Sequence, residues 1–171
     1  MVTEQILIVS ALKEEFPFEG EFNILYTDVG KINVCIKLLE HLNQNPNIHT
    51  IINVGSAAGI NCTKNIVLEC GNFIEGDLDY PNYVPDTITF NPNLNTLATF
   101  DSFQTTLPKR TCNCIDMEGY AIAKICKLKK VNFFCFKYIS DIIGDINQDS
   151  EWIKNYQKGR FLLKEKVIKL L

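Results

Sequence analysis

Short apolar runs alternate along this chain with segments of helical periodicity, and this pattern predicts strands that alternate with helices. The runs that indicate buried strands are residues 6–9, 23–26, 50–54, 66–68, 112–116 and 133–139. Residues 75–96 are instead rich in Pro, Asn and Asp, so we expect a loop with little regular structure there.

Three other segments carry hydrophobic residues at helical spacing. The first predicts a helix over residues 32–42, with its apolar positions at Ile32, Cys35, Ile36, Leu39 and Leu42. The second predicts a helix over residues 119–127, facing the core through Ala121, Ile122, Ile125 and Cys126. Ser150 and Glu151 start the third, a long amphipathic helix to the C-terminus, with apolar positions at Trp152, Tyr156, Leu163, Val167 and Leu170.

Alternating strands and helices indicate an α/β fold in which helices flank a central mixed β-sheet. The chain has 171 residues, the length of one ordinary domain, and 46% of them are hydrophobic, which suffices for a substantial core. No internal repeat, low-complexity segment or linker is evident. We therefore expect a single domain spanning residues 1–171.

The charge of the chain narrows the classes of function. The net charge is −3, and no basic face of the kind that binds nucleic acid is evident. No apolar run approaches the roughly 20 residues that cross a bilayer. Residues 1–5 lack the features of a signal peptide. We expect a cytoplasmic protein that binds neither nucleic acid nor a membrane.

The seven cysteines predict reduced thiols rather than disulfides or a metal centre. Their number is odd, and their spacing fits neither a disulfide framework nor a metal-binding pair. The two histidines, His41 and His49, are expected at the surface, and no metal or cofactor is implied. Cys114 is a candidate nucleophile, but no histidine is placed to activate it, so a core thiol is the preferred interpretation.

Polar and acidic residues follow several of the predicted strands. Glu15 follows the first apolar run, a glycine-containing turn at residues 55–59 follows the third, and Glu118 and Asp141 follow the last two. Ligands of α/β sheets bind where strands end, so the three carboxylates could converge on one pocket. Taken singly, each has the alternative interpretation of a helix cap or a solvated residue. The turn matches neither a dinucleotide-binding nor a phosphate-binding loop.

Five segments, taken together, resemble the nucleoside phosphorylase/nucleosidase superfamily, and within it the 5′-methylthioadenosine/S-adenosylhomocysteine nucleosidases. In order they are residues 8–15 (IVSALKEE), 29–33 (VGKIN), 52–59 (INVGSAAG), 116–123 (DMEGYAIA) and 139–141 (ISD). The chain is shorter than typical members. Residues 16–26 and 103–112 are compressed, so the resemblance implies that fold with some peripheral strands missing.

The resemblance implies hydrolysis of the N-glycosidic bond of an adenine nucleoside. Glu15 would activate water, Asp141 would protonate adenine N7, and Ser56 would help to hold Asp141 or the water. Glu118 would bind the ribose hydroxyls, with Met117 against the sugar. The resemblance also implies a homodimer and three further substrate contacts, namely Phe103 on the purine and Val29 and Trp152 around the 5′-substituent.

Two alternatives remain open from the sequence. A phosphorylase of the same fold would use phosphate instead of water, but a phosphate site favours arginine. Arg110 and Arg160 lie outside the five segments, and Lys31 is the only cation expected nearby. A non-catalytic nucleoside-binding or storage protein is the second alternative. The joint presence of Glu15, Ser56, Glu118 and Asp141 argues against it.

Overall fold

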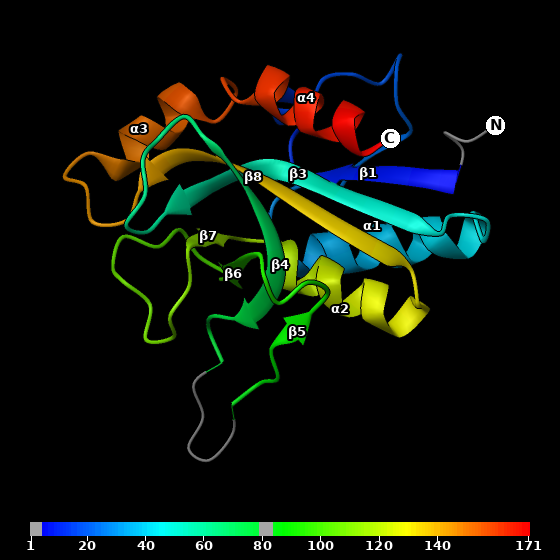
Figure 1. Ribbon diagram of the computed structural model, residues 1–171, viewed down its shortest axis with the longest axis horizontal. Helices are drawn as coiled ribbons and strands as arrows, with labels where there is room; N and C mark the ends of the chain where they lie inside the picture. The colour runs from blue at the N-terminus through cyan, green and yellow to red at the C-terminus, as the bar shows by residue number, and fades with distance from the viewer. Residues whose placement is uncertain (1–4, 79–83) are drawn as a thin grey trace.

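The computed structural model describes residues 5–78 and 84–171, whose strands form one eight-stranded mixed sheet (Figure 1). The strands are β1 (Ile6–Ser10), β2 (Ile24–Tyr26), β3 (Thr50–Gly59), β4 (Val67–Glu75), β5 (Ile88–Thr89), β6 (Asn95–Thr99), β7 (Cys114–Asp116) and β8 (Asn132–Ile142). The helices are η2 (Lys13–Glu15, 3-10), α1 (Lys31–Gln44), α2 (Gly119–Lys129), α3 (Gln148–Asn155) and α4 (Arg160–Leu170). The predicted α/β class and all six predicted strands are confirmed.

Five of the strands close into a ring. β3 pairs with β8, β8 with β4, β4 with β6, β6 with β7, and β7 returns to β3. β1 and β2 extend the sheet beyond β3 as parallel strands. Of the two compressed segments, residues 16–26 contain the short strand β2 at their end, and residues 103–112 contain no strand.

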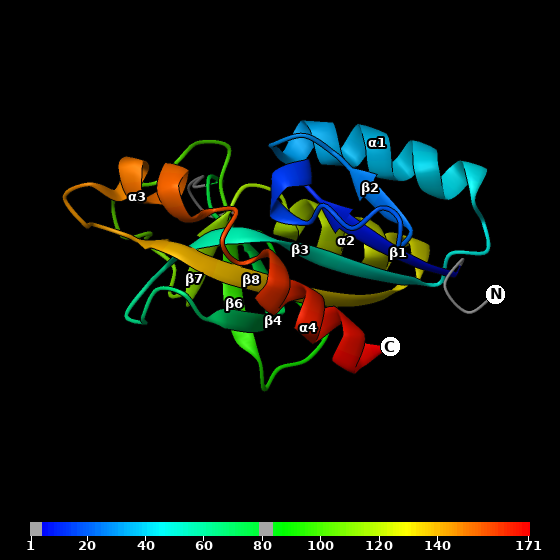
Figure 2. The same ribbon diagram turned by 90° about the horizontal axis from the view of Figure 1, so that it is seen from above.

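Helices pack on both faces of the sheet (Figures 1 and 2). Alternate residues of β1, Leu7 and Val9, face the cluster that includes Val34 of α1 and Ile122 of α2. Ile8, between them, faces the opposite cluster, with Leu163 and Val167 of α4. This alternation is the period of two of a β-strand, and it buries both faces of the sheet.

Several expected boundaries are wrong in ways that matter for the site. Residues 55–59 are not a turn but the second half of β3, because they pair with β8. β8 likewise continues through Asp141, with an irregularity in its pairing to β3 between Ala57 and Ala58. Residues 75–96, expected as loop, include β5 and the start of β6. β5 and β6 are stabilised by pairing with β4, which is distant from β6 in the sequence. A local sequence pattern does not predict such pairing.

The helices also differ from expectation. The C-terminal helix is interrupted at residues 156–159, where Gly159 lies so close to Tyr138 that a Cβ atom would overlap the ring. Helix α1 buries Val34, Leu38 and Leu42, whereas Ile32 and Ile36, two of the apolar positions that predicted the helix, are 75% and 61% exposed. Both faces of α1 carry apolar residues, so the sequence pattern alone does not select the buried face. Packing on the sheet and on α2 selects it.

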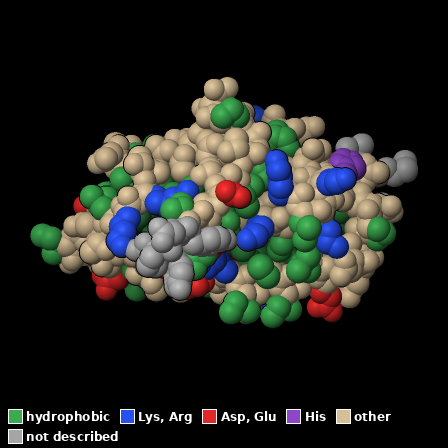
Figure 3. Space-filling view, turned by 90° about the horizontal axis from the view of Figure 1, so that it is seen from below, with side chains coloured by type: hydrophobic (Ala, Val, Ile, Leu, Met, Phe, Trp, Pro, Cys, Tyr) green, Lys and Arg blue, Asp and Glu red, His purple; other side chains and the backbone are tan. Residues whose placement is uncertain are grey.

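One face carries more positive charge than the net charge suggests. Lys and Arg side chains lie among hydrophobic ones on the face shown in Figure 3, with fewer acidic side chains. Four exposed lysines lie on α2 and at its C-cap, namely Lys124, Lys127, Lys129 and Lys130. Positive charge near the carboxyl end of a helix is stabilising, which accounts for the last three.

Across residues 5–78 and 84–171, no helix combines the length and the apolar character needed to cross a membrane.

We expect Gly159→Ala to destabilise the fold, because a methyl group there would displace the buried ring of Tyr138. Overpacking of this kind costs about 1–3 kcal/mol, and about 2–4 °C per kcal/mol in a chain of this size. Gly20→Ala is the matched control, since no atom lies within 4 Å of a Cβ at Gly20. Thermal unfolding of the two variants checks this, and equal melting temperatures would contradict the close packing at Gly159.

Candidate active site

A cavity of about 300 Å³ lies at the carboxyl ends of β3, β7 and β8 and against the segments that follow β1 and β6. The structure brings all the site residues predicted from the sequence to this cavity: Glu15, Val29, Ser56, Phe103, Met117, Glu118, Asp141 and Trp152. Its volume is at the lower end of the range for small-molecule sites, which is roughly 300–1,000 Å³.

Glu15 is held against β3 by Ser56. The backbone N–H and the Oγ hydroxyl of Ser56 donate hydrogen bonds to Glu15 Oε1, at 2.8 and 2.6 Å. A Cβ atom at Gly55 would lie 3.2 Å from Glu15 Oε2, so the glycine leaves room for the carboxylate. Burial raises the pKa of Glu15, while the donors from Ser56 and the charge of Lys137 oppose that rise. Ser56 thus contacts Glu15, and Asp141 has other partners.

Asp141 is buried within β8 and receives one hydrogen bond on each oxygen. Ser140 Oγ donates to Oδ1 at 2.6 Å, and Gln148 Nε2 donates to Oδ2 at 2.9 Å. Burial raises the pKa of Asp141 above its ordinary value, although both hydrogen bonds oppose the rise. Gln148 also donates to the carbonyl of Gln104 at 2.8 Å, so α3 joins Asp141 to the segment that carries Phe103. These contacts exclude the interpretation of Asp141 as a solvated helix cap.

Glu118 precedes α2 without capping it. Its Oε1 accepts a hydrogen bond from the backbone N–H of Gly30 at 2.7 Å. Gly30 has a φ of +105°, a conformation that favours glycine. Burial and the neighbouring charge of Asp116 raise the pKa of Glu118 to about 8. The side chain that accepts the first N–H of α2 is that of Asp116, which binds the N–H of Gly119 at 2.8 Å.

Lys137 is a functional candidate that the sequence analysis missed. It lines the cavity from β8, and its Nζ lies 2.9 Å from Asp116 Oδ2, with both side chains almost fully buried. Burial alone would lower the pKa of Lys137, but its contact with Asp116 and the charges of its other acidic neighbours together outweigh burial and raise it. The expectation that Lys31 is the only nearby cation is therefore wrong. The available signal was a lysine inside an otherwise apolar strand.

Aromatic and apolar side chains form the rest of the wall. The rings of Phe103 and Trp152 meet edge to face with centroids 6.2 Å apart, and Trp152 Nε1 donates to Ser56 Oγ at 3.1 Å. Phe103 is 42% exposed and Val29 is 38% exposed, and both line the cavity. An apolar wall with a few anchored polar groups is typical of a site for a small organic molecule.

The remaining sequence candidates lie elsewhere. All seven cysteines are free thiols, and Cys114 is buried against Cys70 rather than at the cavity. Neither His41 nor His49 lines the cavity. Within residues 5–78 and 84–171, no cluster of His, Cys, Asp and Glu side chains has an arrangement that could bind a metal ion.

We expect Glu118→Gln to stabilise the protein increasingly as the pH rises from 4 to 8. The pKa of Glu118 is raised from 4.5 to about 8, so the unfolded chain releases this proton first, and wild-type stability falls across that range. Glutamine keeps an acceptor for Gly30 N–H and carries no charge. The stability difference should grow by about 2–4 kcal/mol.

Thermal unfolding measured at several pH values checks this, with Glu14→Gln as a control that changes an exposed carboxylate. A difference between Glu118→Gln and wild type that stays constant with pH would argue against a buried, protonated Glu118.

Comparison with known proteins gives a likeness of structure without a likeness of sequence. No family model and no curated protein sequence matches the chain. A protein of Borrelia burgdorferi, described as a 5′-methylthioadenosine/S-adenosylhomocysteine nucleosidase bound to adenine, superimposes with a TM-score of 0.81 at 19% identity, over 97% of this chain and 100% of the other.

Two further solved structures superimpose on this chain equally well. A protein of Francisella philomiragia, described as the same type of nucleosidase, has a TM-score of 0.85 at 16% identity, with 98% of each chain covered. A futalosine hydrolase of Helicobacter pylori has a TM-score of 0.80 at 14% identity, with 99% of each chain covered. From the strand order, the closed ring of strands and these superpositions, we conclude that the chain has the nucleoside phosphorylase/nucleosidase fold.

Proposed function

We propose that this protein hydrolyses the N-glycosidic bond of an adenine nucleoside, such as 5′-methylthioadenosine or S-adenosylhomocysteine, to free adenine and the thioribose product. The observation that carries the proposal is a set of three buried carboxylates, Glu15, Glu118 and Asp141, on one small cavity with apolar walls. Buried carboxyl groups whose pKa values are raised in a cleft are typical of acid–base catalysis.

Glu15 is the proposed general base. Its Oε1 is occupied by the two donors from Ser56, and these together with the charge of Lys137 favour the anion that a base requires. The carboxylate would accept a proton from water as the water attacks the anomeric carbon. Glu118 is the proposed acceptor for ribose hydroxyls, because Gly30 N–H binds only its Oε1.

Asp141 is the proposed general acid. Adenine leaves poorly as an anion, and a proton delivered to N7 makes it a neutral leaving group. Burial favours the protonated carboxyl that this step needs. The division between a base and an acid follows the logic of glycosidases, which use two carboxyl groups around an oxocarbenium-like transition state. The adenine bound to the Borrelia neighbour supports this purine as the base.

Water rather than phosphate is the proposed nucleophile. Lys137 is the cation of the cavity, but Asp116 already pairs with it at 2.9 Å, and the lysine is 1% exposed. A phosphate dianion beside Glu15 would be repelled, and no unpaired cation among residues 5–78 and 84–171 lines the cavity to compensate.

We further propose that the chain works as a single domain in a cytoplasmic homodimer with a role in methionine salvage. Support for the dimer comes from the apolar side chains of Ile32 and Ile36, which are exposed on α1 close to Val29 of the cavity. A small-molecule nucleoside is the proposed partner, and no cofactor is invoked.

Incubation with 5′-methylthioadenosine should release adenine at a rate that does not depend on phosphate. The reason is that Lys137, the lysine that lines the cavity, is paired with Asp116. Adenine is measured by chromatography with and without phosphate. Strict dependence on phosphate, with a sugar 1-phosphate as product, would identify a phosphorylase. Binding without turnover would identify a non-catalytic nucleoside-binding protein.

Asp141→Asn should reduce adenine release by about 10²–10⁴-fold, because an amide cannot deliver a proton to N7. The variant should lose much less activity on p-nitrophenyl riboside, whose leaving group needs no protonation. Asp145→Asn is the control, since Asp145 is exposed on the following turn and does not line the cavity. Equal small losses on both substrates would mean that Asp141 is structural.

A further inference from the structure

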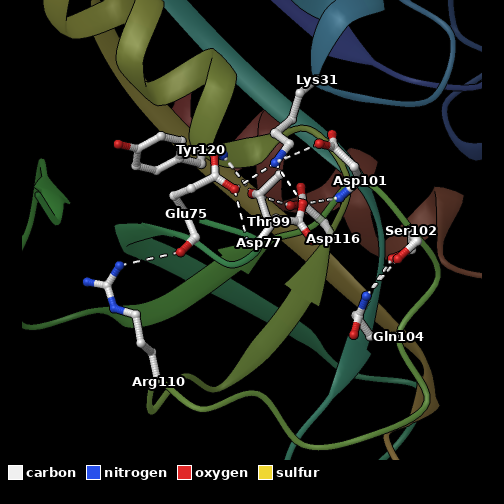
Figure 4. A network of polar contacts seen from close by, with 10 residues as sticks. All are labelled: Lys31, Glu75, Asp77, Thr99, Asp101, Ser102, Gln104, Arg110, Asp116 and Tyr120. Carbon is white, nitrogen blue, oxygen red and sulfur yellow. Dashed lines mark hydrogen bonds and ion pairs between the residues drawn. The ribbon is translucent and has the colours of Figure 1, made fainter. Parts of the chain in front are cut away.

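Lys31, the first residue of α1, lies at the centre of an ion-pair cluster beside the cavity (Figure 4). Its Nζ lies 2.6 Å from Glu75 Oε1, 2.8 Å from Asp77 Oδ2 and 3.3 Å from Asp101 Oδ2. The lysine side chain is only 14% exposed. Burial by itself would lower the pKa of Lys31, but hydrogen bonds to Asp77 and Glu75 outweigh burial and raise it, so the lysine remains charged.

The three carboxylates come from two segments that the lysine holds together. Glu75 ends β4 and Asp77 follows it, whereas Asp101 follows β6. The backbone N–H of Asp101 also donates to Asp77 Oδ2, and that of Asp77 donates to Glu75 Oε1 at 3.2 Å. Without the lysine, three negative charges would repel one another across this junction. β4 and β6 are already paired up to Glu75 and Thr99, and Lys31 adds the positive charge that offsets the repulsion beyond that pair.

Each end of the cluster is continuous with a wall of the cavity. On one side, Gly30 directly precedes Lys31 and donates its N–H to Glu118 at 2.7 Å. On the other, Asp101 is followed at once by Ser102, Phe103 and Gln104, all of which line the cavity. Lys31 itself is not a lining residue. Lys31 can thus act on a bound molecule only through Gly30, which contacts Glu118, and through the segment that follows Asp101.

We propose that Lys31 is a positioning residue that clamps the Glu118 side of the cavity to the Phe103 side, so that both walls are preformed for the substrate. The clamp concerns the nucleoside site put forward above and rests on that proposed function. Preformed walls reduce the ordering that binding requires, so the clamp contributes to affinity rather than to the chemical step. The lysine touches no reacting group.

Trp152 offers a readout of the clamp that needs no substrate. It is the only tryptophan in the chain, and its ring meets that of Phe103 edge to face. Lys31→Met removes the charge but keeps the length of the side chain. Released from Lys31, the segment from Asp101 to Gln104 should expose Trp152, and acrylamide should quench its fluorescence more strongly than in wild type. Lys31→Arg keeps the charge and should restore the wild-type value.

Lys37→Met is the matched control. Lys37 lies on the same helix and is 40% exposed, but its ion pair is with Asp28 and does not reach Glu75, Asp77 or Asp101. In the adenine-release assay, Lys31→Met should raise KM about tenfold with kcat changed less than about threefold, and Lys37→Met should change neither. A kcat loss without a KM change in Lys31→Met would overturn the positioning role.

The quenching of Trp152 fluorescence tests the positioning role of Lys31 without any measurement of turnover. Wild-type quenching in Lys31→Met, or equal increases in Lys31→Met and Lys37→Met, would overturn it. If wild type releases no adenine, the proposed function fails and the quenching comparison still stands. If Lys31→Met does not fold, Asp101→Asn provides the test at a side chain that is 65% exposed. Increased quenching in that variant supports the clamp, and unchanged quenching overturns it.

Discussion

The buried ion pair between Lys137 and Asp116 is the interaction on which the cavity depends. It joins β8 to β7, and Asp116 extends it by accepting hydrogen bonds from Thr99 Oγ1 at the end of β6 and from the first N–H of α2. A buried charge without its partner costs several kcal/mol, so each of the two residues requires the other. The pair thereby fixes three strands and one helix around the floor of the cavity.

The same pair governs the charge of the site. Glu15, Glu118 and Asp141 are buried beside Asp116, and burial of so many carboxyl groups raises the pKa values of the three that face the cavity. The positive charge of Lys137 opposes that rise at Glu15 and at Glu118. One buried lysine therefore limits the rise in these two pKa values, and its own charge is paired with Asp116.

The long strands β3 and β8 explain how distant segments reach one cavity. They pair in parallel over most of their length, which places Gly55 opposite Lys137, Ser56 opposite Tyr138 and Ala58 opposite Asp141. The end of β3 also pairs with β7 on the edge away from β8, which closes the ring and brings Glu118 to the same side. The register between these strands therefore forms the site, because it brings together short motifs that are far apart along the chain.

Much of this could be predicted from the sequence because the information is local. Apolar runs predicted the strands, and carboxylates just beyond them predicted Glu15, Glu118 and Asp141 at one cavity. Features that depend on contacts between distant segments could not be predicted in this way. They include the strand β6 and the interruption of the C-terminal helix over Tyr138. They also include the contacts of Ser56 with Glu15 and of Gln148 with Asp141. Lys137 was visible in the sequence, but only the packing of Asp116 against it explains why a lysine is stable in that strand. Local pattern predicts the strands and the polar residues that follow them, whereas only the tertiary structure decides which face of a helix is buried and which residues meet, because both depend on packing between distant segments.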